Sequence, residues 1–335
     1  MKKYLIRVII FFCPIVFLLS FELFLPLNFF TYRPWEALIY EKNGMKFVPN
    51  QKLPMISVGD LCAYTNYAIK KNELWITDNL GFRNNSFISN PDVLVIGDSF
   101  IVGCSLHQDS ILTNTLNKKT KGSLTFYNIA SATFSDFIQL LNLQIIQKPK
   151  IVIFSIVECD DPPAIRYLSY NYKTSYFSII KYKLTRSYCQ KYLSSMISRK
   201  SIPFFPQSPI NEKMFFLDIK QEEHNVVENA NIIKTYKNFC DSLSIDFIFL
   251  PMPNKKTVYF EEVPFSEQPN YLLELAKELD KLGIMNINTL EIYNNFRANN
   301  EKRIYHYDDI HWNWDAVNII SDTILSRIGE RKRLE

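Results

Sequence analysis

The chain has 335 residues, with 38 Lys and Arg against 34 Asp and Glu, for a formal net charge of +4. This length suits one large domain with an anchor and an insertion, and a hydrophobic content of 47% permits a sizeable core. The charge is too small to favour a nucleic-acid partner, and none is expected. Because the six Cys form no C-x-x-C pair and the four His are scattered, we predict no metal and no cofactor.

The N-terminus combines a basic start with a long apolar run. Lys2, Lys3 and Arg7 precede residues 8–30, which are almost wholly apolar. Such a run is long enough to cross a bilayer, and the positive start favours a cytoplasmic N-terminus. A cleaved signal peptide is the alternative, but no small-x-small cleavage site follows. We therefore predict a single-pass anchor over 1–30 in the cytoplasmic (inner) membrane, with the rest of the chain periplasmic or otherwise extracytoplasmic.

A lead-in segment over residues 31–90 precedes the core. Residues 74–77 predict a short edge strand, and the sequence from Asp78 to Asn84 predicts a turn. The core then begins at Val93 with four apolar residues that run into Gly97-Asp98-Ser99. Three of these apolar residues are β-branched, which is typical of a strand buried on both faces.

Further strand and helix patterns alternate along the rest of the chain. Strands are predicted at 93–96, 124–128, 151–156, 245–250 and, shorter, 285–288. Helices are predicted from Ser99 to about Lys119 and over about 137–147, 226–243, 270–282 and 316–328. This order predicts an α/β fold over residues 91–330, a parallel five-stranded sheet inside a three-layer sandwich.

An insertion at residues 162–211 interrupts this alternation. It contains no Asp or Glu, while Lys, Arg and Tyr are interleaved along it. Two interpretations stay open, a solvated surface insertion and a cap beside Ser99. A cap of this composition would hold an anionic glycan on tyrosine faces and basic side chains.

The chemistry rests on a serine and a histidine at opposite ends of this domain. Ser99 follows the first core strand, where the ligands of open α/β sheets bind. A serine hydroxyl is a poor nucleophile until a base takes its proton. His311 follows Asp308 and Asp309, either of which could orient the imidazole. We predict a Ser99-His311-Asp triad, with Asp309 or Asp308 as the acid.

Two stretches resemble the first and last motif blocks of the SGNH, or GDSL, hydrolases: Gly97-Asp98-Ser99-Phe100 and Asp308-Asp309-Ile310-His311. The resemblance implies a flavodoxin-like fold, Ser99 as nucleophile and oxyanion donors in two middle blocks. In the turn that begins at Asn128, Thr133 occupies the oxyanion glycine position, and Asp160 replaces the usual asparagine. A carboxylate donates no hydrogen bond unless it is protonated. Either Asp160 is held neutral, a neighbour supplies the donor, or the site is impaired.

A narrower resemblance is to the alginate O-acetyltransferase group of that superfamily. It rests on residues 251–255 with Tyr259, and on residues 305–312, which end in Trp312. In that group the acid stands two residues before the histidine, which favours Asp309, whereas the general pattern selects Asp308. The block order here is the ordinary one with the serine first, so the chain resembles a relative of that group.

This resemblance implies an extracytoplasmic serine O-acyltransferase or esterase that acts on an acylated surface or exported polysaccharide, with O-acetyl as the expected group. A membrane-bound partner that delivers the acyl group is compatible with this function. The alternative is a non-catalytic, membrane-tethered glycan-binding or assembly subunit on the same fold.

Overall fold

We analysed a computed structural model of the chain. It describes residues 2–24, 33–39, 47–64, 69–166, 214–217, 223–265 and 267–331. Most of the predicted insertion at 162–211 lies outside these ranges, so the cap beside Ser99 stays a prediction.

The centre of the fold is a parallel sheet with the strand order β4-β3-β5-β6. Its strands are β3 (Val93–Gly97), β4 (Phe126–Ala130), β5 (Ile151–Val157) and β6 (Asp246–Met252). In the described part of the chain the sheet has four strands, so the prediction of five is wrong. At the expected fifth position, Asn286 forms only an isolated parallel bridge to Phe249. The chain then turns at Asn288, whose side chain accepts the N–H of Glu291 and starts the next helix.

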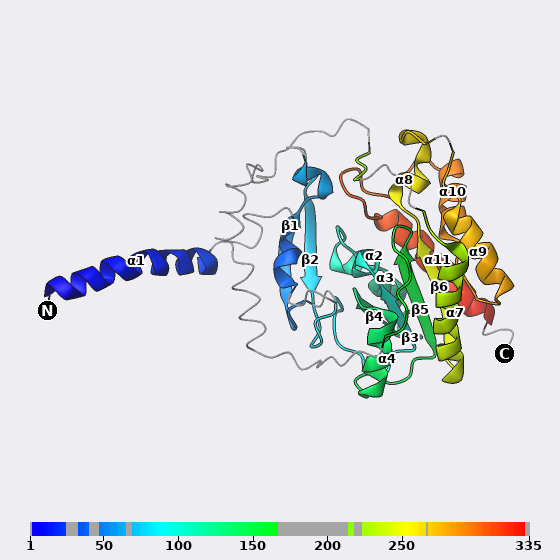
Figure 1. Ribbon diagram of the computed structural model, residues 1–335, viewed down its shortest axis with the longest axis horizontal. Coiled ribbons are helices and arrows are strands. Elements are labelled where there is room, and N and C mark those ends of the chain that lie inside the picture. The colour runs from blue at the N-terminus through cyan, green and yellow to red at the C-terminus, as the bar shows by residue number, and fades with distance from the viewer. Residues whose placement is uncertain are drawn as a thin grey trace.

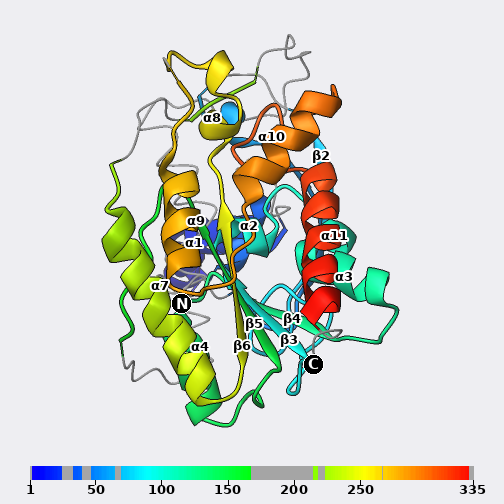
Figure 2. The ribbon, with the colours of Figure 1, turned by 90° about the vertical axis from the view of Figure 1, so that its right-hand side faces the viewer.

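Helices cover both faces of this sheet, as Figure 2 shows. Along β3, Val93 and Val95 pack into one core with α2, α3, α10 and α11, whereas Leu94 and Ile96 pack into a second core with α4, α7 and α9. The predicted α/β three-layer arrangement is confirmed. These helices are α2 (Ser99–Val102), α3 (Leu112–Thr120), α4 (Phe134–Asn142), α7 (Val226–Ser242), α9 (Tyr271–Lys281), α10 (Thr289–Asn299) and α11 (Trp314–Arg331).

The helix predicted from Ser99 to Lys119 is broken. It ends after one turn because Gly103 adopts φ 78°, a left-handed conformation that glycine takes without steric cost. Ser105 also has a positive φ, of 65°. The chain resumes as a 3-10 turn, η3 (Gln108–Ser110), before α3 begins. The break places Ser105 outside any helix, where its hydroxyl can reach the site described below.

The N-terminal residues form a helix, α1 (Lys2–Phe24). Over the residues that the structure describes, no helix has both the length and the apolar character needed to cross a bilayer. The predicted membrane span is therefore unsupported. An extracytoplasmic location for the domain stays a prediction.

The lead-in segment forms a separate antiparallel pair, β1 (Lys52–Ser57) and β2 (Lys71–Ile76), beside the main sheet (Figure 1). The edge strand predicted at 74–77 thus belongs to this pair and not to the core sheet. Arg83 fixes the segment to the domain, because its fully buried guanidinium donates to the carbonyls of Leu74, Val102, Gly103 and Leu106. These bonds attach the lead-in to the loop that follows Ser99.

Candidate active site

Ser99 is fixed at the junction of β3 and α2. The carboxylate of Asp98, the N-cap of α2, accepts hydrogen bonds from the N–H groups of Phe100 and Val157, both at 2.8 Å. Burial raises the pKa of Asp98 to about 6, although these bonds oppose the shift. A Cβ on Gly97 would lie 2.3 Å from Cγ1 of Ile101, so glycine here leaves room for the Ile101 side chain against the end of β3. The carboxyl ends of β3 and β5 together hold Ser99 at this edge of the sheet.

Three predicted side chains form one hydrogen-bonded chain at this edge. His311 Nε2 lies 2.8 Å from Ser99 Oγ, and His311 Nδ1 lies 2.5 Å from Asp309 Oδ1. Ser105 donates to the other oxygen of Asp309 at 2.8 Å. Burial opposes ionisation of Asp309, but the charge and hydrogen bond of His311 and the charge of Lys71 outweigh it. They hold the pKa of Asp309 well below its usual range.

Asp308 points away from this chain, towards the lead-in segment. Its carboxylate accepts two hydrogen bonds from Lys71 Nζ, at 2.7 and 2.8 Å, and one each from the N–H groups of Gly59 and Ile69. The contact requires glycine at 59, because a Cβ there would lie 2.2 Å from the Asp308 carbonyl oxygen. The neighbouring aspartates therefore differ in their contacts: Asp309 holds the histidine, and Asp308 locks the lead-in segment onto the loop.

The loop from Tyr305 to Trp312 is supported by the segment after β6. Lys255 is buried, and its Nζ donates to backbone carbonyls at 2.6 to 3.2 Å, namely those of Phe215, His306, Tyr307 and Asp309. Burial lowers the pKa of Lys255 to about 7, against the charges of Asp309 and Asp308. Trp312 Nε1 donates to the Phe100 carbonyl at 3.1 Å. The hydrogen bonds of Lys255 thus join the segment of residues 251–255 to the loop of residues 305–312.

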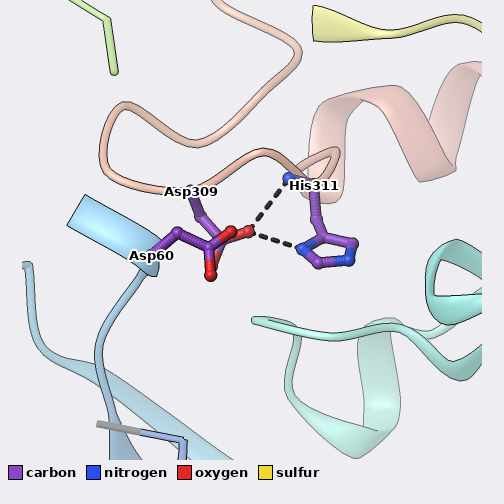
Figure 3. A group of neighbouring side chains, drawn as sticks. All are labelled: Asp60, Asp309 and His311. Carbon is purple, nitrogen blue, oxygen red and sulfur yellow. Dashed lines mark hydrogen bonds and ion pairs between the residues drawn. The ribbon is translucent and has the colours of Figure 1, made fainter. Parts of the chain in front are cut away.

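Asp60 is a neighbour of the triad that no local sequence motif indicates (Figure 3). It begins η2 (Asp60–Ala63), is buried and forms an ion pair with Arg33. Oxygens of Asp60 and Asp309 and a ring nitrogen of His311 lie within 4.8 Å of one another, a donor set that could hold a metal ion. However, His311 Nδ1 already contacts Asp309, and Nε2 contacts Ser99. The geometry favours a hydrogen-bonded triad.

The residues that resemblance placed in the oxyanion site are used differently. The Thr133 N–H donates to Asp136 Oδ2 at 2.7 Å, inside the capping box of α4. Asn128 is fully buried, and its amide donates to the Arg83 carbonyl and to Thr113 Oγ1. Thr133 thus caps α4, and Asn128 joins β4 to the lead-in segment and to α3. Of these three predicted residues, Asp160 alone lines the pocket of Ser99, as far as the described residues define it.

That pocket has a volume of about 350 Å³. It extends from Ser99 across the ends of β5 and β6. Its lining combines apolar and polar side chains: Ser99, Phe100, Val157, Cys159, Asp160, Phe216, Leu217, Asn254, Lys255, Lys256 and Ile310. A cavity of this size fits a small ester group beside the serine hydroxyl.

Comparisons with known proteins give matches in structure alone. No protein-family model matches the chain, and no curated protein matches it. It is similar to a psychrotrophic esterase, EstA, from Pseudoalteromonas sp. (TM-score 0.38, 12% identity, covering 73% of this chain and 100% of that one). A lipase/acylhydrolase from Enterococcus faecalis is also similar (TM-score 0.38, 13% identity, 73% and 97% covered). So is a putative lipolytic protein of the G-D-S-L family from Desulfitobacterium hafniense DCB-2 (TM-score 0.37, 11% identity, 70% and 97% covered). Because these TM-scores lie below 0.5, the function proposed below rests on the geometry of the site.

Proposed function

We propose that the protein is a serine esterase, an acyl hydrolase of the Ser-His-Asp type. The observation that carries the proposal is the unbroken chain from Ser99 Oγ through His311 to Asp309, with contacts of 2.8 and 2.5 Å. These are the contacts by which a base activates a serine and an acid orients the base.

The reaction that this arrangement supports has two halves. His311 Nε2 takes the proton of Ser99 as the serine oxygen attacks the ester carbonyl carbon. The protonated imidazole then gives the proton to the leaving alcohol, and an acyl group stays on Ser99. In the second half, His311 takes a proton from water as the water oxygen attacks the acyl-serine. The imidazolium then gives this proton to the leaving Ser99 oxygen, and the carboxylic acid is released. Throughout, the ionised Asp309 stabilises the imidazolium form of His311.

The substrate that we propose is a small acyl ester, an O-acetyl group on a polysaccharide. A pocket of about 350 Å³ suits a short acyl chain, and the sequence resemblance described above favours a glycan. Acyl transfer uses the same acyl-serine, with a sugar hydroxyl in place of water as the second nucleophile.

A specific observation favours a second candidate, a non-catalytic glycan-binding subunit. The Thr133 N–H is occupied by Asp136, and Asp160 is a carboxylate where an oxyanion donor is expected. Loss of one oxyanion donor lowers rates by about 10²–10³. Reactivity of Ser99 distinguishes the two candidates.

The test compares the purified full-length chain with Ser99→Ala on p-nitrophenyl acetate and with a fluorophosphonate probe. We expect Ser99→Ala to abolish labelling and to lower kcat by several orders of magnitude, since removal of the nucleophilic serine of subtilisin lowers kcat on the order of 10⁶-fold. Ser242→Ala, at the end of α7, is the matched control and should behave as the unmodified chain. Equal hydrolysis by the unmodified chain and Ser99→Ala would refute the esterase. An unlabelled chain without hydrolysis would support the binding subunit.

A further inference from the structure

Asn254 lines the Ser99 pocket and carries an unpaired side-chain donor. Asn254 follows β6 and lines the same pocket as Ser99 and Asp160. Its Nδ2 atom is buried and has no hydrogen-bond partner. Buried polar groups in folded proteins are almost always paired, since an unpaired one costs free energy. An unpaired amide donor on a residue that lines a pocket points to a ligand oxygen as its partner.

The local structure does not need this amide. Asn254 is the N-cap of α8 (Lys255–Val258), a position where the Asn side chain ordinarily accepts a helix N–H. Here the side chain makes no cap bond, and only the backbone carbonyl of Asn254 accepts the N–H groups of Thr257 and Val258. The amide therefore takes no part in capping α8.

The backbone of Asn254 is nevertheless held firmly. Its N–H donates to the Glu158 carboxylate at 2.8 Å, and the Glu158 N–H donates to the Met252 carbonyl at 2.8 Å. Met252 pairs with Val157 in the sheet, so Asn254 follows β6 next to the turn after β5 that carries Asp160. A donor on this fixed backbone costs little reorganisation when charge develops nearby.

We propose that Asn254 Nδ2 donates a hydrogen bond to the ester carbonyl oxygen and to the oxyanion that forms when Ser99 attacks. This inference rests on the proposed esterase function and names a further catalytic residue for it. Asp160 can serve as such a donor only when its carboxyl group is protonated. Asn254 supplies the donor from the neighbouring strand end.

The test measures kcat and KM on p-nitrophenyl acetate for the unmodified chain, Asn254→Ala, Asp160→Asn and the double variant. We expect Asn254→Ala to lower kcat by about 10²–10³ with KM changed little, because the bond strengthens in the transition state. Asp160→Asn returns a carboxamide to the pocket, so the double variant should recover at least about tenfold in kcat over Asn254→Ala. A merely structural role for Asn254 predicts no such rescue.

Asn270→Ala is the matched control. Asn270 is likewise an N-cap whose side chain makes no cap bond, but it is exposed and its amide donates to Glu274. It should keep the kcat of the unmodified chain. Thermal unfolding followed by circular dichroism should give Asn254→Ala an unchanged melting temperature, because no hydrogen bond is lost. If Asn254→Ala does not fold, kcat is measured instead on Asn254→Asp, which is isosteric with the unmodified residue but lacks the amide donor.

The outcomes separate this inference from the function on which it rests. A kcat of Asn254→Ala within about threefold of the unmodified chain, with Ser99→Ala inactive, overturns the role of Asn254 and leaves the esterase standing. A raised KM at unchanged kcat overturns it too, since that indicates ground-state binding only. Equal rates for Ser99→Ala and the unmodified chain refute the esterase itself.

Discussion

Asp308 and Asp309 are adjacent in the chain, yet replacing each by asparagine should damage different properties. Asp309→Asn removes the anion that holds His311 Nδ1 at 2.5 Å, and the new amide can present N–H to the ring in place of an acceptor. Asp308→Asn leaves the triad contacts in place. It removes the charge that pairs with Lys71, whose side chain is only 10% exposed.

The magnitudes follow from these contacts. For Asp309→Asn we expect kcat to fall by about 10⁴, the loss seen when a triad aspartate becomes asparagine in a serine protease. For Asp308→Asn we expect the free energy of unfolding to fall by about 3–5 kcal/mol, as when one partner of a buried pair is removed. Its kcat should stay within about tenfold of the unmodified chain.

Two measurements on each variant decide the matter, urea unfolding at pH 7 and kcat on p-nitrophenyl acetate under folding conditions. Asp109→Asn is the control: Asp109 pairs with Lys118 at the surface, where both side chains are about 60% exposed, and neither quantity should change. The assignment of Asp309 as the triad acid fails if Asp308→Asn loses as much kcat as Asp309→Asn. It fails equally if Asp309→Asn keeps its activity.

Two further predictions concern groups around Ser99. The pKa of Asp98 is raised to about 6 in the folded chain, whereas an unfolded chain releases this proton near pH 4. The folded state therefore binds the proton more tightly. As pH rises from 4 to 7, Asp98 should lower the free energy of unfolding by about 3 kcal/mol. Asp98→Asn should flatten this fall in urea titrations at several pH values, and an unchanged pH slope would contradict the raised pKa. Cys159 is exposed and lines the pocket, so N-phenylmaleimide should block ester hydrolysis by the unmodified chain. Cys159→Ser should resist the reagent, and equal inactivation of both would place the reactive thiol elsewhere.

Local sequence was sufficient to predict the layers and the chemical types at the site. Strands buried on both faces appear as continuous apolar runs, which is why the four strands of the sheet were predicted near their observed positions. It was insufficient where conformation depends on single residues or on weak patterns. The positive φ of Gly103 ends α2 early. The helix α10 is not among the predicted helices, because its Asn-rich sequence has no strong helical repeat of apolar residues.

The sequence by itself determined an α/β domain with a serine after its first core strand and a histidine preceded by two acids. Those features depend on short-range patterns that a chain carries wherever it folds. Tertiary structure alone decided which acid faces the histidine, because Asp308 and Asp309 differ only in what surrounds them. Lys71 and Gly59 surround one, while Ser105 and His311 surround the other. The same holds for Asn254 and Asp60, which reach the site from distant segments with no local motif, through packing of the strand ends and the lead-in segment.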